Sequence, residues 1–261
     1  MGRAWYLAGL LVELQLSQLR PARIGLGRVL VLLDFPIALV AIALVLVAMD
    51  ALPRRCWLVG GPAIALCAVV ALPGVVDQAD LDAKPVNVIP AIGVVLALAL
   101  TVAAGRTAPR PPGVRHLERI VAAIVVLAIL ALPWIAAELG FHLPGGIYLT
   151  DELYQGHPAV HLGHHHGLDG TLLVVTAILL WPVRLGSLRR CRLLHAYLAV
   201  MVAYGLVNAT QDFWTEQIHK RGWTNRLIPD ALHPSVSWVW LVILLLAGAI
   251  YALFGPRGQR P

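Results

Sequence analysis

The sequence predicts an all-α, polytopic integral membrane protein, a helical bundle of about seven transmembrane helices. Of its 261 residues, 59% are hydrophobic and only 13% are charged, whereas about a quarter of the residues in a soluble domain are charged. The mean hydropathy of the chain is +0.78. Its apolar residues come in runs of about twenty, which is long enough to cross a ~30 Å hydrocarbon core as a helix. An ordinary soluble globular fold is therefore excluded.

The apolar runs predict seven crossings within a single transmembrane domain that covers residues 29–254. The predicted crossings are residues 29–49, 57–76, 88–104, 120–137, 171–183, 194–213 and 236–254. The fifth crossing is short by itself, which leaves an earlier start open. Residues 1–28 become amphipathic before their arginines and predict an interfacial segment, with an eighth crossing by residues 4–19 as the alternative.

Basic residues are distributed unevenly between the two sets of alternate loops, and this predicts the orientation of a multi-pass protein in the cell membrane. The loops expected in the cytoplasm, together with the tail at 255–261, are rich in arginine. Their arginines are Arg54, Arg55, Arg106, Arg110, Arg115, Arg119, Arg184, Arg189, Arg190, Arg192, Arg257 and Arg260. The loops at 77–90, 138–170 and 212–235 contain few basic residues and are expected to face outward. The net charge of +6 is thus explained by topology, and nucleic acid is not expected as a partner.

The longest outward loop contains a dense histidine cluster, GHPAVHLGHHHGLDG, over residues 156–170. Its candidate metal ligands are His157, His161, His164 and His165. Pro158 suits the first turn of a helix, and a helix that began there would place three or four of these imidazoles on one face. Neutral imidazole is a common ligand for Zn, Cu, Fe and Ni. The cluster therefore predicts a metal site, with a flexible polar loop as the alternative.

A second group of polar residues ends the sixth predicted crossing. Asn208, Asp212, Glu216 and His219 fall at i, i+4, i+8 and i+11, which is one face of a continuous α-helix. Glu216 and His219 have the Glu-x-x-His spacing by which di-iron carboxylate proteins bring two ligands to one metal. The alternative is a helix end that emerges into water with its acids solvated.

Both groups are expected on the same side of the membrane, so together they predict one site for a divalent metal ion, Zn, Fe or Cu. Its ligands would be a subset of His157, His161, His164, His165, Asp212, Glu216 and His219. The sequence does not show whether the two groups meet in space, and it assigns no catalytic residue.

The spacing of His161, His164 and His165 forms an HxxHH box, which resembles the boxes of the membrane fatty-acid desaturase and hydroxylase superfamily. That superfamily uses several such boxes, whereas this chain has one, in a loop expected outside, so the family is not assigned. The resemblance implies that several imidazoles can hold iron. Fingerprints for serine hydrolysis, zincin chemistry and nucleotide binding are absent from the sequence.

Three hypotheses follow for the function. The first is a metal-dependent membrane enzyme, an oxidoreductase or a hydrolase, that acts on a lipid-like substrate beside the bilayer. The second is a metal-ion transporter or delivery protein, for which Asp34 and Asn208 are among the few polar groups within the spans. The third is a non-catalytic assembly subunit that contacts other membrane subunits through small residues. The glycines expected at close helix contacts are Gly60, Gly61, Gly93 and Gly248.

Overall fold

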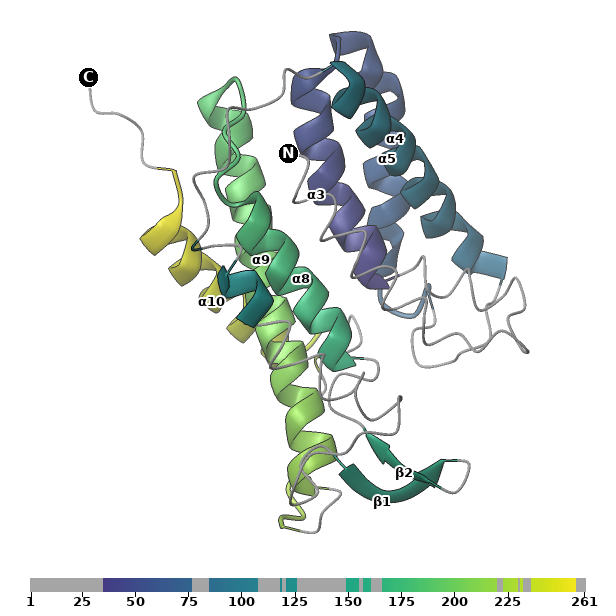
Figure 1. Ribbon diagram of the computed structural model, residues 1–261, viewed down its shortest axis with the longest axis vertical. Coiled ribbons are helices and arrows are strands. Elements are labelled where there is room, and N and C mark those ends of the chain that lie inside the picture. The colour runs from purple at the N-terminus through teal and green to yellow at the C-terminus, as the bar shows by residue number, and fades with distance from the viewer. Residues whose placement is uncertain are drawn as a thin grey trace.

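The computed structural model describes residues 35–76, 85–107, 118, 121–125, 149–154, 157–160, 166–219, 223–229, 231 and 236–256. Across these residues the chain forms a helical bundle with one small β-hairpin at its end (Figure 1). The α-helices are α3 (Phe35–Ala51), α4 (Trp57–Ala68), α5 (Val88–Thr107), α8 (His166–Leu180), α9 (Leu188–Phe213) and α10 (Trp238–Phe254). The shorter elements are the 3-10 turns η2 (Arg54–Cys56), η3 (Val69–Ala71) and η4 (Pro85–Asn87), the π-helical turn η6 (Trp214–His219), and the strands β1 (Leu149–Tyr154) and β2 (His157–Val160).

The predicted class, an all-α membrane bundle, is confirmed. Three helical segments are long and apolar enough to cross a membrane, and three shorter apolar helices accompany them. The long segments are Arg54–Ala71, Pro85–Thr107 and Leu188–Phe213, and the shorter ones are Pro36–Ala51, Asp169–Leu180 and Trp238–Phe254. Within the described residues the number of full-length spans is thus lower than the seven predicted. The shorter helices reach only about 18–26 Å at 1.5 Å per residue, less than the ~30 Å hydrocarbon core.

The ends of the helices differ from the predicted crossings. The crossing expected at 57–76 is α-helical only to Ala68, and the chain then turns at Gly74, whose φ of 73° lies in the left-handed region that favours glycine. The fifth crossing does begin earlier than residue 171, at His166, and it ends at Leu180. Residues 1–28 and most of the fourth crossing, 120–137, lie outside the described residues.

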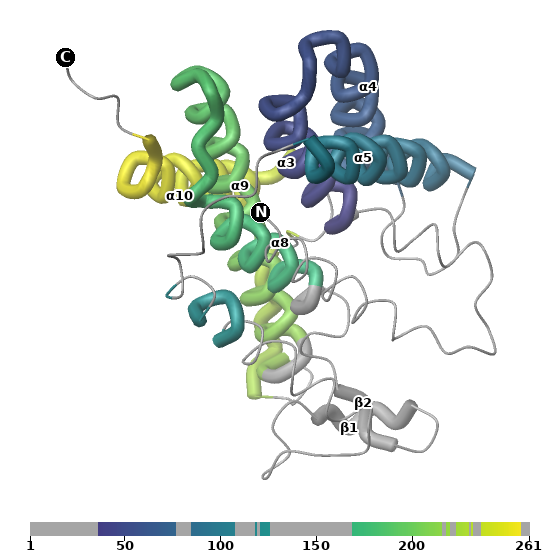
Figure 2. The backbone as a smooth tube through the Cα atoms, turned by 45° about the horizontal axis from the view of Figure 1, so that its top comes forward, coloured from purple at the N-terminus to yellow at the C-terminus, as the bar shows by residue number. Residues whose placement is uncertain are grey.

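The bundle consists of two groups of three helices, α3–α5 and α8–α10, which Figure 2 shows side by side. Helix α3 joins the groups, because it contacts α4 and α5 on one side and α8 and α9 on the other. Its residues Ala38, Ala43 and Val45 have no exposed surface. A helix that is apolar all round is expected to be buried in this way.

Helices α8 and α9 form an antiparallel hairpin that is closest at two glycines. A Cβ atom added to Gly205 would lie 2.6 Å from the backbone oxygen of Gly170. Gly60 and Gly93 are also at close contacts within the chain, against Met49 and Cys67. At Gly61 and Gly248 an added Cβ meets no atom of the described residues within 4 Å. The contacts expected of these four glycines are with other membrane subunits, so they stay a prediction.

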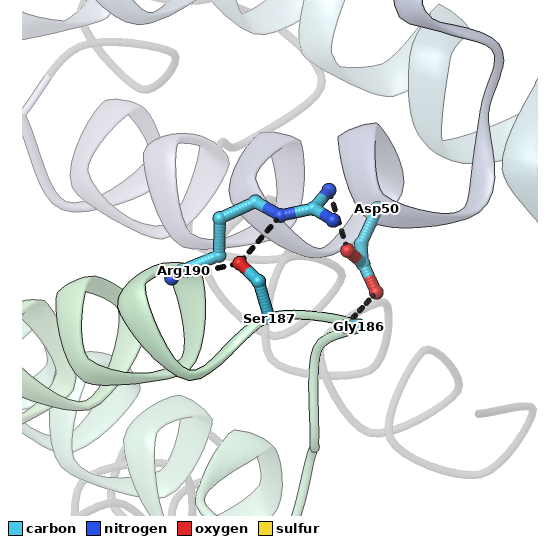
Figure 3. Close-up of polar contacts among 4 residues, drawn as sticks. All are labelled: Asp50, Gly186, Ser187 and Arg190. Atoms are coloured by element: carbon cyan, nitrogen blue, oxygen red, sulfur yellow. Dashed lines mark hydrogen bonds and ion pairs between the residues drawn. The ribbon is translucent and has the colours of Figure 1, made fainter.

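A polar clamp ties the two helix groups together at the end of the bundle where α3 finishes and α9 begins (Figure 3). The Asp50 carboxylate forms an ion pair of 2.6 Å with Arg190 and accepts a 2.8 Å hydrogen bond from the Gly186 backbone N–H. Ser187 caps α9, since its hydroxyl accepts from the backbone N–H and from Nε of Arg190. The β-hairpin and the final turns of α9 lie at the opposite end of the bundle (Figure 1).

Candidate functional site

The last turns of α9 bury polar side chains. Asn208 is 1% exposed and Asp212 is 6% exposed. They lie four residues apart in a regular helix, so they share one face, as predicted. The burial of Asp212 is inconsistent with a simple solvated helix end.

The helix changes its geometry immediately after these residues. Helix α9 ends at Phe213, and residues Trp214–His219 form the π-helical turn η6. The expectation of one continuous α-helical face that reaches Glu216 and His219 is therefore wrong beyond Phe213, because a π turn, with i→i+5 hydrogen bonds, has a different periodicity. Such turns are rare and frequently occur at functional sites.

His219 at the end of η6 is oriented by the backbone that follows it. Its Nδ1 lies 3.1 Å from the carbonyl oxygen of Thr224. Because a carbonyl only accepts, a hydrogen bond here requires Nδ1 to carry the proton, and the Nε2 lone pair of the neutral ring is then available to a metal. A carbonyl that fixes the tautomer in this way is the usual outer partner of a metal-ligating histidine.

The segment after η6 folds back over the end of α9. The Trp214 indole N–H donates to the carbonyl of Arg226 at 2.8 Å, and the backbone N–H of Ala231 donates to the Gln211 side chain at 2.6 Å. These two bonds attach residues far apart in the sequence to the same helix end. They help to explain why side chains near the end of α9 are buried.

The β-hairpin corrects the predicted conformation of the histidine cluster. Residues His157–Val160 form strand β2, paired antiparallel with β1 so that Tyr154 lies opposite His157 and Leu153 opposite Pro158. A helix that begins at Pro158 is thus wrong, and His157 is not the first residue of a helical ligand face. The reason is tertiary, because the preceding strand supplies a pairing partner that sequence spacing does not show. His161, His164 and His165 lie outside the described residues.

The structure brings the strand pair that contains His157 next to the turn that ends at His219. Strand β1 contacts η6, so the hairpin that contains His157 lies beside the turn that contains Glu216 and His219 (Figure 1). Helix α8 begins at His166, where its first turns run against the end of α9. Among the described residues, no three side chains of His, Cys, Asp or Glu are grouped closely enough to hold a metal ion.

Sequence reasoning missed two buried polar residues near this end, Thr171 in α8 and Gln211 in α9, which are 0% and 7% exposed. Thr171 follows Gly170 directly, in the turn of α8 that approaches α9 most closely. A polar residue at each end of an apolar run was the available signal, but it does not show whether the side chain is buried or in water.

Comparisons with protein-family models, with curated proteins and with solved structures find no match to the chain.

Proposed function

We propose that this protein is an integral membrane metalloprotein that holds a divalent metal ion, Zn, Fe or Cu, where the β-hairpin, η6 and the start of α8 converge. The proposed ligands are a subset of His157, His161, His164, His165, Asp212, Glu216 and His219. Mixed imidazole and carboxylate ligands suit these metals better than the harder Mg and Ca. The positive-inside rule supports an extracytoplasmic position for this end, because the arginine-rich loops belong to the other end.

The contact between β1 and η6 is the observation that carries the proposal. It brings the strand pair that contains His157 next to the turn that contains Glu216 and His219. About sixty residues separate the two segments in the sequence. His219 adds support, because its Nδ1 contact with Thr224 leaves Nε2 available to a metal.

Chain connectivity supports a contribution from the remaining histidines. Residues 161–165 link Val160 at the end of β2 to His166 at the start of α8. A fully extended link of this length reaches only about 20 Å. Because the sequence joins these histidines directly to β2 and α8, we propose that a subset of His161, His164 and His165 completes the ligand set.

The proposed activity is that of a metal-dependent enzyme that acts on a lipid-like substrate, as an oxidoreductase or a hydrolase. A Zn ion at this position would activate water, whereas Fe or Cu would activate oxygen. The lipid-like substrate is proposed from the membrane location, because apolar helix faces of the bundle are exposed. In α10, Leu241, Leu244 and Leu245 are 59%, 56% and 65% exposed, as lipid-facing side chains would be.

Elemental mass spectrometry of protein purified in detergent, without a polyhistidine tag, tests the proposal. We expect a stoichiometric metal in the wild type and its loss in His161→Ala/Glu216→Ala. The double variant His116→Ala/Glu118→Ala removes the same two residue types from a loop expected on the cytoplasmic side and serves as the matched control. Wild-type protein without metal, or equal loss from both variants, would overturn the proposal.

A further inference from the structure

Asn208 of α9 and Trp240 of α10 carry three buried polar atoms that have no partner among the described residues. Within the part of the chain that the structure describes, Oδ1 and Nδ2 of Asn208 both lack a hydrogen-bond partner, and so does Nε1 of Trp240. Asn208 as a whole is 1% exposed. Together the two side chains offer one acceptor and N–H donors from two different groups.

Tyr204 links these two side chains. Its ring stacks on the Trp240 ring, with centroids 5.1 Å apart and an interplanar angle of 21°. Asn208 lies one helical turn after Tyr204, so their Cβ atoms are about 6 Å apart on the same face of α9. Tyr204 is thus a neighbour of both residues, of Trp240 through ring stacking and of Asn208 through helical spacing.

These atoms lie below the polar end of the bundle. Asn208 precedes the end of α9 at Phe213 by five residues, which places it about 8 Å inside that end. At such a depth water is scarce, and an unpaired amide is unfavourable for folding. An amide that is buried at this cost calls for a hydrogen-bond partner that the fold itself does not supply.

We infer that Asn208 and Trp240 bind the hydroxyl group of a long-chain alcohol. The hydroxyl oxygen accepts from the Asn208 amide and from the Trp240 indole N–H, while its own proton is donated to Oδ1 of Asn208. One hydroxyl thus satisfies all three atoms, which an alkane or an ether cannot do. The alkyl chain lies along the lipid-facing side of α10. This inference rests on the proposed function for the alcohol's role as substrate, and it places the hydroxyl one turn from Asp212.

The bound alcohol enters between α9 and α10. Both side chains are closed off from solvent at the atoms concerned. Helix α10 buries only a narrow stripe of its surface, made by Val239, Ile243 and Ala247. A helix held along one stripe separates from its neighbour more easily than α3, which is enclosed by four helices.

Photolabelling in lipid nanodiscs tests this inference with a diazirine-bearing analogue of dodecanol. We expect saturable labelling of α9 and α10 that dodecanol displaces and dodecyl methyl ether does not. Asn208→Leu and Trp240→Phe should each weaken the apparent affinity about tenfold or more, the effect of removing hydrogen bonds in a buried site. Thr101→Val is the matched control, because it removes another buried unpaired oxygen, on α5.

The melting temperature and metal content of the same variants separate the possible outcomes. Asn208→Leu should melt at or above the wild-type temperature, so its loss of labelling would not reflect misfolding. Unchanged labelling in Asn208→Leu and Trp240→Phe, or equal displacement by the ether, would overturn the inference. Metal-free wild-type protein that still shows specific labelling would refute the proposed metalloprotein and leave the alcohol site supported.

Discussion

At the scale of single residues, Tyr197 shows how one hydroxyl links the two groups of helices. The side chain belongs to α9, and its hydroxyl donates a 2.8 Å hydrogen bond to the backbone oxygen of Leu39 in α3. That oxygen lies in the first turns of α3, which packs against both groups of helices. The bond therefore ties α9 to α3 through a main-chain acceptor.

Tyr197→Phe should lower the free energy of unfolding by about 1 kcal/mol, because hydrogen bonds between membrane helices contribute modestly. Thermal unfolding in detergent, followed by circular dichroism, measures the change. Tyr251→Phe in α10 removes the same atom elsewhere and is the control. An equal loss in both variants would contradict the assigned role of Tyr197.

His195 illustrates what the sequence could not predict about single residues. Loop charges place it on the arginine-rich side, but its ring is fully buried. Nδ1 lies 2.8 Å from the Cys191 carbonyl, and Nε2 lies 2.8 Å from the Trp181 carbonyl and 3.1 Å from an Arg184 nitrogen. These contacts depend on the tight turn between α8 and α9, which hydropathy does not describe. Asn208, in contrast, was identified from helical spacing alone.

At the scale of helices and strands, the α8–α9 hairpin depends on its two facing glycines. Gly205→Ala should lower the free energy of unfolding by about 1–3 kcal/mol, since the added methyl group overlaps the Gly170 backbone. This loss should exceed the gain from the better helix propensity of alanine, about 1 kcal/mol. Differential scanning calorimetry of detergent-solubilised protein measures the balance.

Gly248→Ala in α10 is the control for this substitution, because an added Cβ there meets nothing within 4 Å. We expect it to leave the melting temperature unchanged or to raise it. If Gly205→Ala behaves in the same way, the close approach of α8 and α9 is not a determinant of stability.

Hydropathy predicts the existence of helices better than their ends. The described helices all fall on predicted apolar runs, because a run of that length has to be buried from water. The boundaries depend on local geometry instead, such as the positive φ of Gly74 or the π turn after Phe213. The strand at His157–Val160 was missed because four residues show no clear period, and the pairing with β1 determines their conformation.

At the scale of the whole molecule, the two ends of the bundle have different chemistry. The end with the α8–α9 turn exposes arginines, while the other end collects buried polar groups and those candidate ligands that the structure describes. The unequal loop charges predicted this separation. They could not predict that Asp50 would pair with Arg190, because that contact joins residues from separate helix groups.

Asp50→Asn should lower the free energy of unfolding by about 1 kcal/mol, because the ion pair is lost while an acceptor for Gly186 remains. Asp50→Ala should cost about 1 kcal/mol more, since the Gly186 N–H also loses its partner. Chemical unfolding at low and high salt tests this order. The difference between wild type and Asp50→Asn should shrink at high salt.

Glu118→Gln, at an exposed position far from the clamp in the sequence, controls for the loss of one negative charge alone. A destabilisation as large as that of Asp50→Ala would show that net charge, and not the clamp, accounts for the effect. Unchanged stability in both Asp50 variants would mean that the clamp does not help to hold the helix groups together.

Because α8 and α9 differ in length, the position of η6 relative to the membrane surface depends on the thickness of the bilayer. Helix α9 has 26 residues and α8 has 15, so they extend about 39 Å and 23 Å. Helix α9 is thus about 9 Å longer than a typical hydrocarbon core. Each ångström of mismatch costs a fraction of a kcal/mol, and a helix relieves it by tilting. Longer acyl chains would therefore draw η6 closer to the headgroups, and shorter ones would leave it standing in water.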